Sequence, residues 1–296
     1  MKDLNGYLVR GHYASRDELR ERIPELHPLK DKSIAVFGLG CLGAPSALEF
    51  AKAGIRRIHL VDHDTVDPAT AVRWPVGFRA AGHGKADLLH GIIRRDYPYT
   101  ESKPFPFRMG RTRSPETDSR SDMEIIEDIF KGVDLVYDAT AELGVQHFLS
   151  DRARALRITY IGVAGTLGGW GGKVFRIRPH PESGCWLCYQ WHCQAGGIPE
   201  PPSAPDQQGR VQPAGCADPT FTGAGFDMLY IALAGVRMAV STLCEGATNA
   251  YPKSAWDVLH IRLRGDNGTL VVPTYATYEI TRHPECRNLH VPDGKQ

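Results

Sequence analysis

One short stretch near the start of the chain constrains its fold more than any other. Residues 33–37 are short, apolar and β-prone, and they lead into Gly38, Gly40 and Gly43, which have the G-x-G-x-x-G spacing. The first glycine permits a sharp turn, the second lets a phosphate approach the backbone, and the third lets helix and strand pack closely. The pattern predicts a βαβ unit that binds a nucleotide with its phosphates at a helix N-terminus.

The residues that follow complete this unit. Residues 44–53 are small and compatible with a helix, and a second apolar strand over 57–61 ends on Asp62, with Asp64 two residues later. An acid at the position of Asp62 can reach a ribose hydroxyl. Dehydrogenases, methyltransferases and flavoproteins share such glycines, so the motif alone does not identify the nucleotide.

Two cations follow the acid-ended strand. Arg73 lies in a polar loop, and Lys85 opens a helix expected over 86–95, whose apolar residues form one stripe. Each would be an ordinary surface residue on its own. Together they stand just beyond Asp62, where a polyphosphate on the glycine turn would need positive charge.

Strands and helices alternate through the middle of the chain. We expect helices over 123–131 and 143–156, strands over 134–138 and 158–163, and an edge strand around 103–108. This alternation predicts a Rossmann-like α/β fold, with a mainly parallel sheet and helices on both faces. Alternating stretches at 173–178 and 257–264 predict an antiparallel extension, and a Pro- and Gly-rich stretch over 194–215 predicts a mobile crossover loop. Asp138 ends a central strand, where ligands of such sheets bind.

Composition narrows the class of protein. The chain has 296 residues, 42% hydrophobic and 23% charged, with a net charge of +1, so a soluble protein with neither a nucleic-acid nor a membrane partner is expected. The longest apolar run, 226–243, contains Asp227 and Arg237 and is better interpreted as a buried helix than as a membrane span. Seven cysteines without an evident export signal favour a cytoplasmic protein whose thiols bind metal or react.

Several motifs occur in one order between residues 30 and 290. After the glycines come D-H-D-T-V-D at 62–67, Arg73, G-H-G-K at 82–85, D-A-T at 138–140, C-x-x-C at 185–188, and then Cys216 and Cys286. This order resembles the ThiF/MoeB adenylyltransferases, the superfamily of the ubiquitin-activating enzymes. The glycine-rich stretch 165–172 is more similar to bacterial ubiquitin-like conjugation systems than to the thiamin or molybdopterin enzymes.

The resemblance implies an activity. ATP would activate the C-terminal glycine of a small ubiquitin-like or sulfur-carrier protein, first as an adenylate and then as a thioester. The three glycines would cradle the ATP phosphates, Asp62 would hold the ribose, and Asp64 would stand near the ribose or Mg²⁺. Arg73 and Lys85 match the family cations that neutralise the triphosphate, because attack of a carboxylate on a phosphate joins two anions.

The chain departs from the family at two places. Thr70 stands where the family has an asparagine. In the family motif D-x-T-D-N the second aspartate binds Mg²⁺, whereas this chain has Asp138-Ala-Thr-Ala-Glu142. Asp138 or Glu142 would then take the metal, or phosphates alone would hold it. The arginine that the family borrows from a partner subunit would be Arg10 or Arg16.

The resemblance also implies a structural zinc. In the family a C-x-x-C shares the metal with a C-terminal pair, which here leaves Cys185, Cys188 and Cys286. Either His290 or His283 would complete a Cys₃His set. Two buried thiols and a surface histidine without metal form the alternative.

Cys216 is the predicted nucleophile. It precedes the start of the long apolar helix, where a helix N-terminus favours a thiolate, and in the family a cysteine at this place accepts the acyl group. Cys193 is the rival in the same region. Cys41 and Cys244 are interpreted as core residues.

The chain is expected to have three parts within one continuous adenylation domain. Residues 1–32 form an N-terminal helical extension, with a capping box at 15–18, and residues 33–180 bind the nucleotide. Residues 181–296 carry the zinc-tethered crossover loop, the cysteine helix and the last strands. A homodimer and a conjugating-enzyme-like acyl acceptor are expected as partners. A nicotinamide-dependent oxidoreductase and a non-catalytic nucleotide-binding adaptor are the competing hypotheses.

Overall fold

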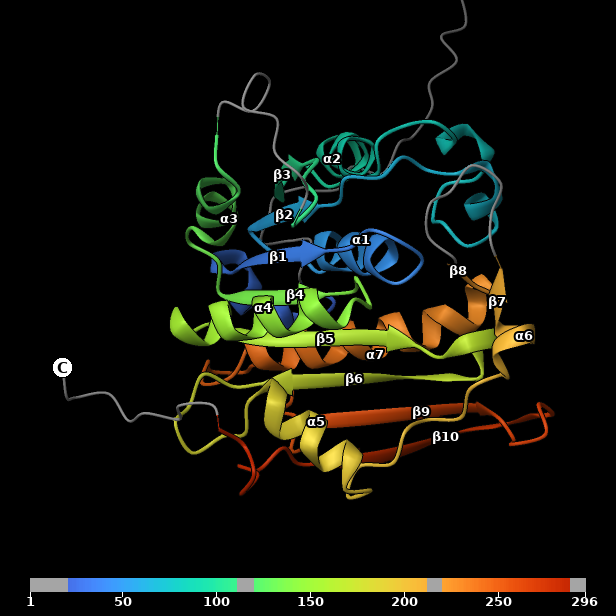
Figure 1. Cartoon of the computed structure of the whole chain (residues 1–296). Coiled ribbons are helices and arrows are strands. Elements are labelled where there is room, and N and C mark those ends of the chain that lie inside the picture. Colours follow the sequence, from blue (N-terminus) through green and yellow to red (C-terminus); the bar gives the residue numbers. More distant parts are fainter. Residues whose placement is uncertain (1–20, 111–119, 212–219, 288–296) are drawn as a thin grey trace, which may run out of the picture.

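The computed structural model describes residues 21–110, 120–211 and 220–287, and these are organised around one eight-stranded sheet (Figure 1). The strand order is β10-β9-β6-β5-β4-β1-β2-β3. Strands β3, β2, β1, β4 and β5 are parallel, and β6, β9 and β10 continue the sheet antiparallel. The strands are β1 Ser33–Phe37, β2 Arg57–Val61, β3 Glu101–Phe105, β4 Leu135–Asp138, β5 Thr159–Gly165, β6 Gly171–Ile177, β9 Val258–Arg264 and β10 Leu270–Tyr278. The predicted mainly parallel sheet with an antiparallel extension is confirmed.

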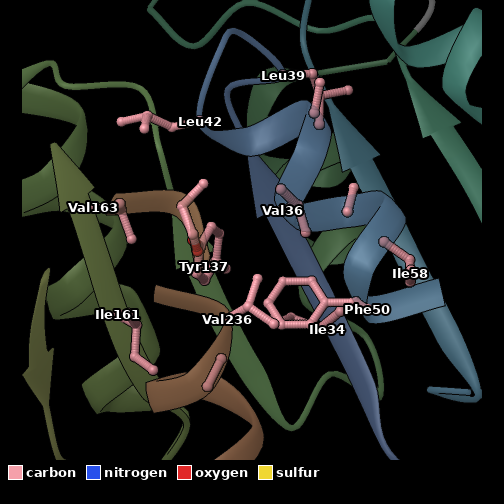
Figure 2. Close-up of a cluster of buried hydrophobic side chains, with 14 of the residues drawn as sticks. Ile34, Val36, Leu39, Leu42, Phe50, Ile58, Tyr137, Ile161, Val163 and Val236 are labelled. Atoms are coloured by element: carbon pink, nitrogen blue, oxygen red, sulfur yellow. The ribbon is translucent and has the colours of Figure 1, made fainter. Parts of the chain in front are cut away.

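Helices cover both faces of the sheet, as predicted. One face packs against α1 (Gly43–Lys52), α2 (Lys85–Asp96) and α7 (Gly225–Leu243), and the other against α3 (Asp122–Phe130), α4 (Leu143–Ala155) and α5 (Trp186–Gln194). Successive side chains of a strand point to opposite faces. Tyr137 accordingly joins the α1/α7 core, where its ring meets the edge of Phe50 at 5.2 Å (Figure 2). Its neighbour Val136 joins the other core.

Helix α7 is the predicted long apolar helix. Among the described helices it is the one with the length and hydropathy of a membrane span, but 61% of that segment is buried inside the protein. Its inner side packs on α1, β5 and β6, and it also contacts 3₁₀ helix η2 (Pro24–Asp31). This packing is that of the buried core helix that was predicted.

One strand of the eight-stranded sheet and one of the helices that cover it were not predicted. Strand β10 has no run of buried apolar residues, because most of its side chains are exposed at the edge of the sheet. Helix α5 lacks an apolar stripe of helical period, and it is held by the packing of Trp186, Cys188 and Tyr189 into the second core. Both elements depend on tertiary contacts more than on local pattern.

The crossover segment, residues 195–211, follows α5 and runs across the end of the sheet. Glu200 accepts hydrogen bonds from Lys173 Nζ at 2.7 and 2.8 Å, and Ala204 N donates to Leu167 O at 2.9 Å. The segment ends with a short helix, α6 (Asp206–Gly209), and with β7 (Arg210–Val211), which pairs with β8 (Thr220–Phe221). These contacts fasten residues 195–211 to β6 and to the turn between β5 and β6. Mobility of the loop, like the division of the chain into three parts, stays a prediction.

Candidate functional site

The glycine turn connects β1 to α1 at the carboxyl edge of the sheet. Gly38 has a φ of +77°, and a Cβ there would lie 2.8 Å from the backbone of Ala139 and Thr140. A Cβ on Gly43 would lie 1.8 Å from Gly38 O, whereas a Cβ on Gly40 would meet nothing within 4 Å. The first and third glycines are therefore needed by the fold, and the second faces open space of the kind that a phosphate requires.

This difference predicts contrasting effects of two substitutions. Gly43→Ala is expected to lower the free energy of unfolding by about 3 kcal/mol or more, because backbone must move. Gly40→Ala is expected to leave stability unchanged and to weaken ATP binding by at least about tenfold, since the methyl group occupies the phosphate's space. Chemical denaturation and calorimetric titration with ATP measure both effects. Equal ATP affinity of Gly40→Ala and the wild type would show that no phosphate sits there.

Asp62 joins the end of β2 to the glycine turn. Its Oδ2 accepts a hydrogen bond from Leu39 N at 2.6 Å, and its Oδ1 accepts one from Asp64 N at 2.8 Å. Lys85 Nζ lies 2.9 Å from Asp64 Oδ2 and 3.9 Å from Asp62 Oδ2. Partial burial acts to raise the pKa of Asp64, but Lys85, with smaller contributions from His63 and Arg108, holds that pKa below its usual value. The two acids thus hold the ammonium group of Lys85 close to the glycine turn, to which Asp62 is bonded.

Arg73 is held on the other side of the site. Its Nη1 donates to Phe221 O at 2.6 Å, and its guanidinium lies 4.9 Å from the centre of the Phe221 ring. The next residue, Trp74, donates from Nε1 to Leu39 O at 2.8 Å, so the loop that carries Arg73 is fastened to the glycine turn. Trp74 was missed in the sequence. The signal was a single large aromatic residue in an otherwise polar loop.

The pKa of Cys41, inside the glycine turn, is affected by both cations. Burial raises the pKa of the Cys41 thiol, and the positive charges of Arg73 and Lys85 both oppose that rise. The geometry agrees, because the residue after Arg73 bonds to Leu39 O and Lys85 lies beside Asp62, which accepts a hydrogen bond from Leu39 N. This is the convergence that a bound polyphosphate would need.

Asp138, a predicted nucleotide-binding residue, is buried and hydrogen-bonded within the protein. Its side chain is fully buried, Oδ1 accepts from Thr140 N and Thr140 Oγ1 at 2.8 and 2.7 Å, and Oδ2 accepts from Tyr160 OH at 2.8 Å. Burial raises its pKa, while the bonds from Thr140 and Tyr160 lower it. Through Tyr160 the carboxylate of Asp138 is tied to the core beneath α4, and through Thr140 N to the loop that lies against Gly38. Both carboxylate oxygens of Asp138 thus have partners within the protein, and its predicted contact with nucleotide or Mg²⁺ stays a prediction.

The loop after β4 lacks the expected metal ligand. Ala141, in place of the second aspartate, has a φ of +59°, a conformation that Asp and Asn tolerate better than Ala. Glu142 is exposed at the N-cap of α4 and provides no side-chain cap. The described residues therefore do not reproduce the acid pair that the resemblance implies for Mg²⁺.

The three zinc-motif cysteines do come together. The Sγ atom of Cys185 lies 3.8 Å from that of Cys188 and 3.6 Å from that of Cys286. Ligands of a tetrahedral zinc with Zn–S bonds of about 2.3 Å are separated by about 3.8 Å, so the spacing fits that metal. His283 does not supply the fourth ligand: its ring stacks on Trp191, and its Nδ1 accepts a hydrogen bond from Glu285 N at 3.2 Å.

Four predicted residues fall outside the described residues: Arg10, Arg16, Cys216 and His290. His290 therefore remains the predicted fourth ligand. Cys216 is followed by β8, whose Thr220 and Phe221 contact Arg73.

The comparisons with known proteins agree with this geometry. The model of the ThiF family matches residues 19–246. The chain belongs to the ThiF family. Uncharacterized protein y4qC of Sinorhizobium fredii is 35% identical over 274 residues, which cover 90% of this chain and 45% of that relative. The adenylyltransferase and sulfurtransferase UBA4 of Vanderwaltozyma polyspora is 29% identical over 216 residues, or 73% of this chain and 42% of that protein. The chain thus spans less than half the length of these relatives.

Solved structures share the fold of this ThiF-family chain. MccB of E. coli with ATP superposes with a TM-score of 0.62 at 13% identity, over 88% of this chain and 68% of that one. PaaA superposes with a TM-score of 0.61 at 15% identity, over 95% and 78% of the two chains. At these identities the likeness shows the Rossmann-like fold alone.

Cys193 is poorly suited to be the nucleophile of a ThiF-family enzyme. It lies at the C-terminal end of α5, where a helix disfavours an anion. Burial raises the pKa of its thiol, and the nearby carboxylate of Glu200 raises it further. Of the other two cysteines that were interpreted as core, Cys244 is buried and Cys41 is half-buried.

Proposed function

We propose that this chain uses ATP to adenylate the C-terminal carboxylate of a small ubiquitin-like or sulfur-carrier protein that ends in glycine. The observation that carries the proposal is the placement of Arg73 and Lys85 beside the glycine turn: Trp74 next to Arg73, and Asp62 next to Lys85, both bond to the backbone of Leu39. Membership of the ThiF family supports it, as does the name of the relative UBA4. Structures of MccB, which shares the fold, are described with ATP and with N-formylated MccA, which supports ATP as the nucleotide proposed here.

The residues of the turn would bind and orient the triphosphate. Helix α1 has no side-chain N-cap, and Gly40 leaves space for an anion at this helix N-terminus. A carboxylate oxygen of the carrier would attack the α-phosphorus, and pyrophosphate would leave. Lys85 would turn from Asp64, and Arg73 from Phe221 O, to offset the charge that gathers as two anions join.

Cys216 would accept the acyl group in the second step. Its thiolate would attack the carbonyl carbon of the adenylate, AMP would leave, and a thioester would form. Cys216 precedes Thr220 by four positions, a span of at most about 14 Å of extended chain. Because Thr220 contacts Arg73, this tether keeps the thiol within reach of the site. A conjugating-enzyme-like acceptor would take the acyl group next.

ATP–pyrophosphate exchange tests this proposal. Exchange that depends on a purified carrier ending in glycine would support it. Absence of exchange together with NAD binding would support the oxidoreductase hypothesis. Binding of ATP without exchange would support the non-catalytic adaptor, which the replacement of the metal aspartate by Ala141 favours.

Zinc at the cysteine cluster is part of the proposal. It would tie the C-terminal segment to α5, and so hold the base of the crossover segment. The purified chain is expected to contain about one zinc per molecule, and Cys185→Ser is expected to lose the metal and lower the melting temperature. Cys244→Ser, a buried cysteine outside the cluster, should keep the metal. A wild-type chain that is folded and free of zinc by elemental analysis would contradict this.

We also propose a homodimer, supported by an apolar stripe on the outer side of α7. The stripe has the i, i+3, i+4, i+7 spacing of a helix face. Its members are Phe226, Leu229, Tyr230 and Leu233, which are 72, 41, 48 and 44% exposed. Leu233→Glu is expected to raise the dimer dissociation constant by at least about a hundredfold in sedimentation experiments, because a charge would enter the interface. Leu270→Glu, at an 81% exposed residue of β10, is the control. A monomeric wild-type chain would overturn the dimer.

The cytoplasm is proposed as the location, in keeping with reduced thiols at the cysteine cluster. Fractionation of cells that express the full chain would test it.

A further inference from the structure

A polar groove of about 490 Å³ lies at the same edge of the sheet as the glycine turn. It is bordered by the β5–β6 turn, the crossover segment, the connector between β8 and α7, and the turn between β9 and β10. None of the steps proposed above uses it. Its position, walls and charge indicate what it binds.

The groove shares one wall with the proposed adenylation site. The connector, residues 222–224, follows directly after β8, where Phe221 O and Thr220 Oγ1 accept hydrogen bonds from Arg73. The next residue, Thr222, lines the groove, together with Gly223 and Ala224. The groove is therefore one short stretch of chain away from Arg73. A polypeptide lying in it would have its end directed towards the nucleotide.

Glycines and one indole form much of the groove's wall. Gly168 and Gly268 have φ values of +73° and +80°, and a Cβ on either would lie less than 3 Å from the ring of Trp170. Gly223 approaches the backbone of Gly169, where an added Cβ would lie 3.2 Å from Gly169 N. Walls of main chain and flat ring leave room for another main chain to approach closely, as extended peptides do in grooves.

Arg264 gives the groove its charge. Among the described residues that line it, Arg264 is the only charged one, and its side chain is 35% exposed. Its anionic neighbour is Asp227, whose Oδ2 lies 3.8 Å away, longer than a hydrogen bond. The guanidinium is therefore available for a stronger, bidentate partner such as a carboxylate.

We propose that this groove binds the residues that precede the activated carboxylate, and that Arg264 recognises an acidic side chain among them. The inference rests on the proposed function, because it names the feature by which the same site selects its polypeptide. An acidic side chain near the C-terminus would pair with Arg264, while the terminal carboxylate extends past the connector towards Arg73. Arg264 would be a specificity-determining residue and would not contact the reacting atoms.

Labelled synthetic peptides test this inference. We would measure the fluorescence anisotropy of ten-residue peptides ending in Gly-Gly with a free carboxylate, which differ only in carrying Glu or Gln upstream of the glycines. The wild-type chain with ATP is expected to bind the Glu peptides about tenfold more tightly. Arg264→Gln is expected to abolish this preference without changing ATP affinity. Asn267→Asp, at an exposed turn residue of the groove, is expected to weaken Glu peptides selectively and leaves the Asp227 pair intact.

Arg262→Gln is the matched control on the same strand. Arg262 pairs with Asp266 and does not line the groove, so the preference for Glu should persist. A Glu preference that survives both Arg264→Gln and Asn267→Asp would overturn the inference, and so would failure of every peptide to bind the wild type. Exchange activity with carriers would remain in either case if the adenylation proposal is right. Loss of exchange with all carboxylate substrates would instead overturn the proposed function.

Discussion

Replacing Lys85 by methionine is expected to lower the rate of ATP–pyrophosphate exchange by about a thousandfold, the upper range for removal of one preorganised charge-stabilising group. Lys85 Nζ lies within 3.9 Å of both site acids, and its side chain is only 12% exposed. Its charge is therefore fixed beside the turn. Exchange would be measured at saturating ATP and carrier. This isolates the chemical step from weaker binding.

The size of this effect follows from where the charge is needed. A carboxylate and a triphosphate are both anionic, and their repulsion is largest as the new bond forms. Methionine keeps the length of the side chain and removes only the charge, and Lys85→Arg should recover part of the rate. Lys103→Met is the control, because Lys103 on β3 pairs with Asp128 of α3 at 2.8 Å, away from the turn. Exchange by Lys85→Met at the wild-type rate would remove Lys85 from the mechanism.

The second large effect is expected at Cys216. Cys216→Ala should retain exchange, because adenylation precedes thioester formation, and should lose the carrier adduct completely. The adduct would be detected by non-reducing electrophoresis and mass spectrometry, and dithiothreitol should release it from the wild type. Burial raises the pKa values of the Cys41, Cys193 and Cys244 thiols, which makes these described cysteines weaker candidates for the nucleophile.

Cys193→Ala is the matched control for that experiment. It should form the adduct normally, because its thiol faces Glu200 and Tyr189 rather than the connector next to Arg73. If Cys216→Ala still forms a reducible adduct and Cys193→Ala does not, Cys193 is the nucleophile. Loss of exchange by Cys216→Ala would show instead that this residue serves the first step.

Much of the fold could be predicted because its signals are local. Strands β1 and β2 are short apolar runs that are buried on both faces, and α2 and α7 have apolar residues at helical spacing. Strand β10 has the opposite character, since Leu270 and Val272 are more than 80% exposed. Helix α5 was also not predicted, because its aromatic and cysteine side chains do not form one apolar stripe. Which of them are buried depends on contacts with the second core.

The candidate site was predictable where spacing along the chain implies proximity in space. Gly38 to Gly43 and Asp62 follow from the βαβ unit, and Lys85 reaches the turn because it opens the next helix. The hydrogen bonds of Asp138 to Thr140 and Tyr160 were not predictable from its place at a strand end. Whether such a residue faces the ligand or the core depends on the phase of the strand, which places Asp138 beside Tyr160. The groove around Arg264 joins four distant segments and could only be found in three dimensions.

The central claim is that Arg73 and Lys85 serve a triphosphate under attack by a polypeptide carboxylate. The most direct test is incorporation of labelled pyrophosphate into ATP by the purified chain with a carrier ending in glycine, compared with the same carrier amidated at its C-terminus. Our account predicts exchange with the free carboxylate, none with the amide, and its loss in Arg73→Leu and Lys85→Met. Exchange that is equal with both carriers, or that persists in both variants, would contradict it.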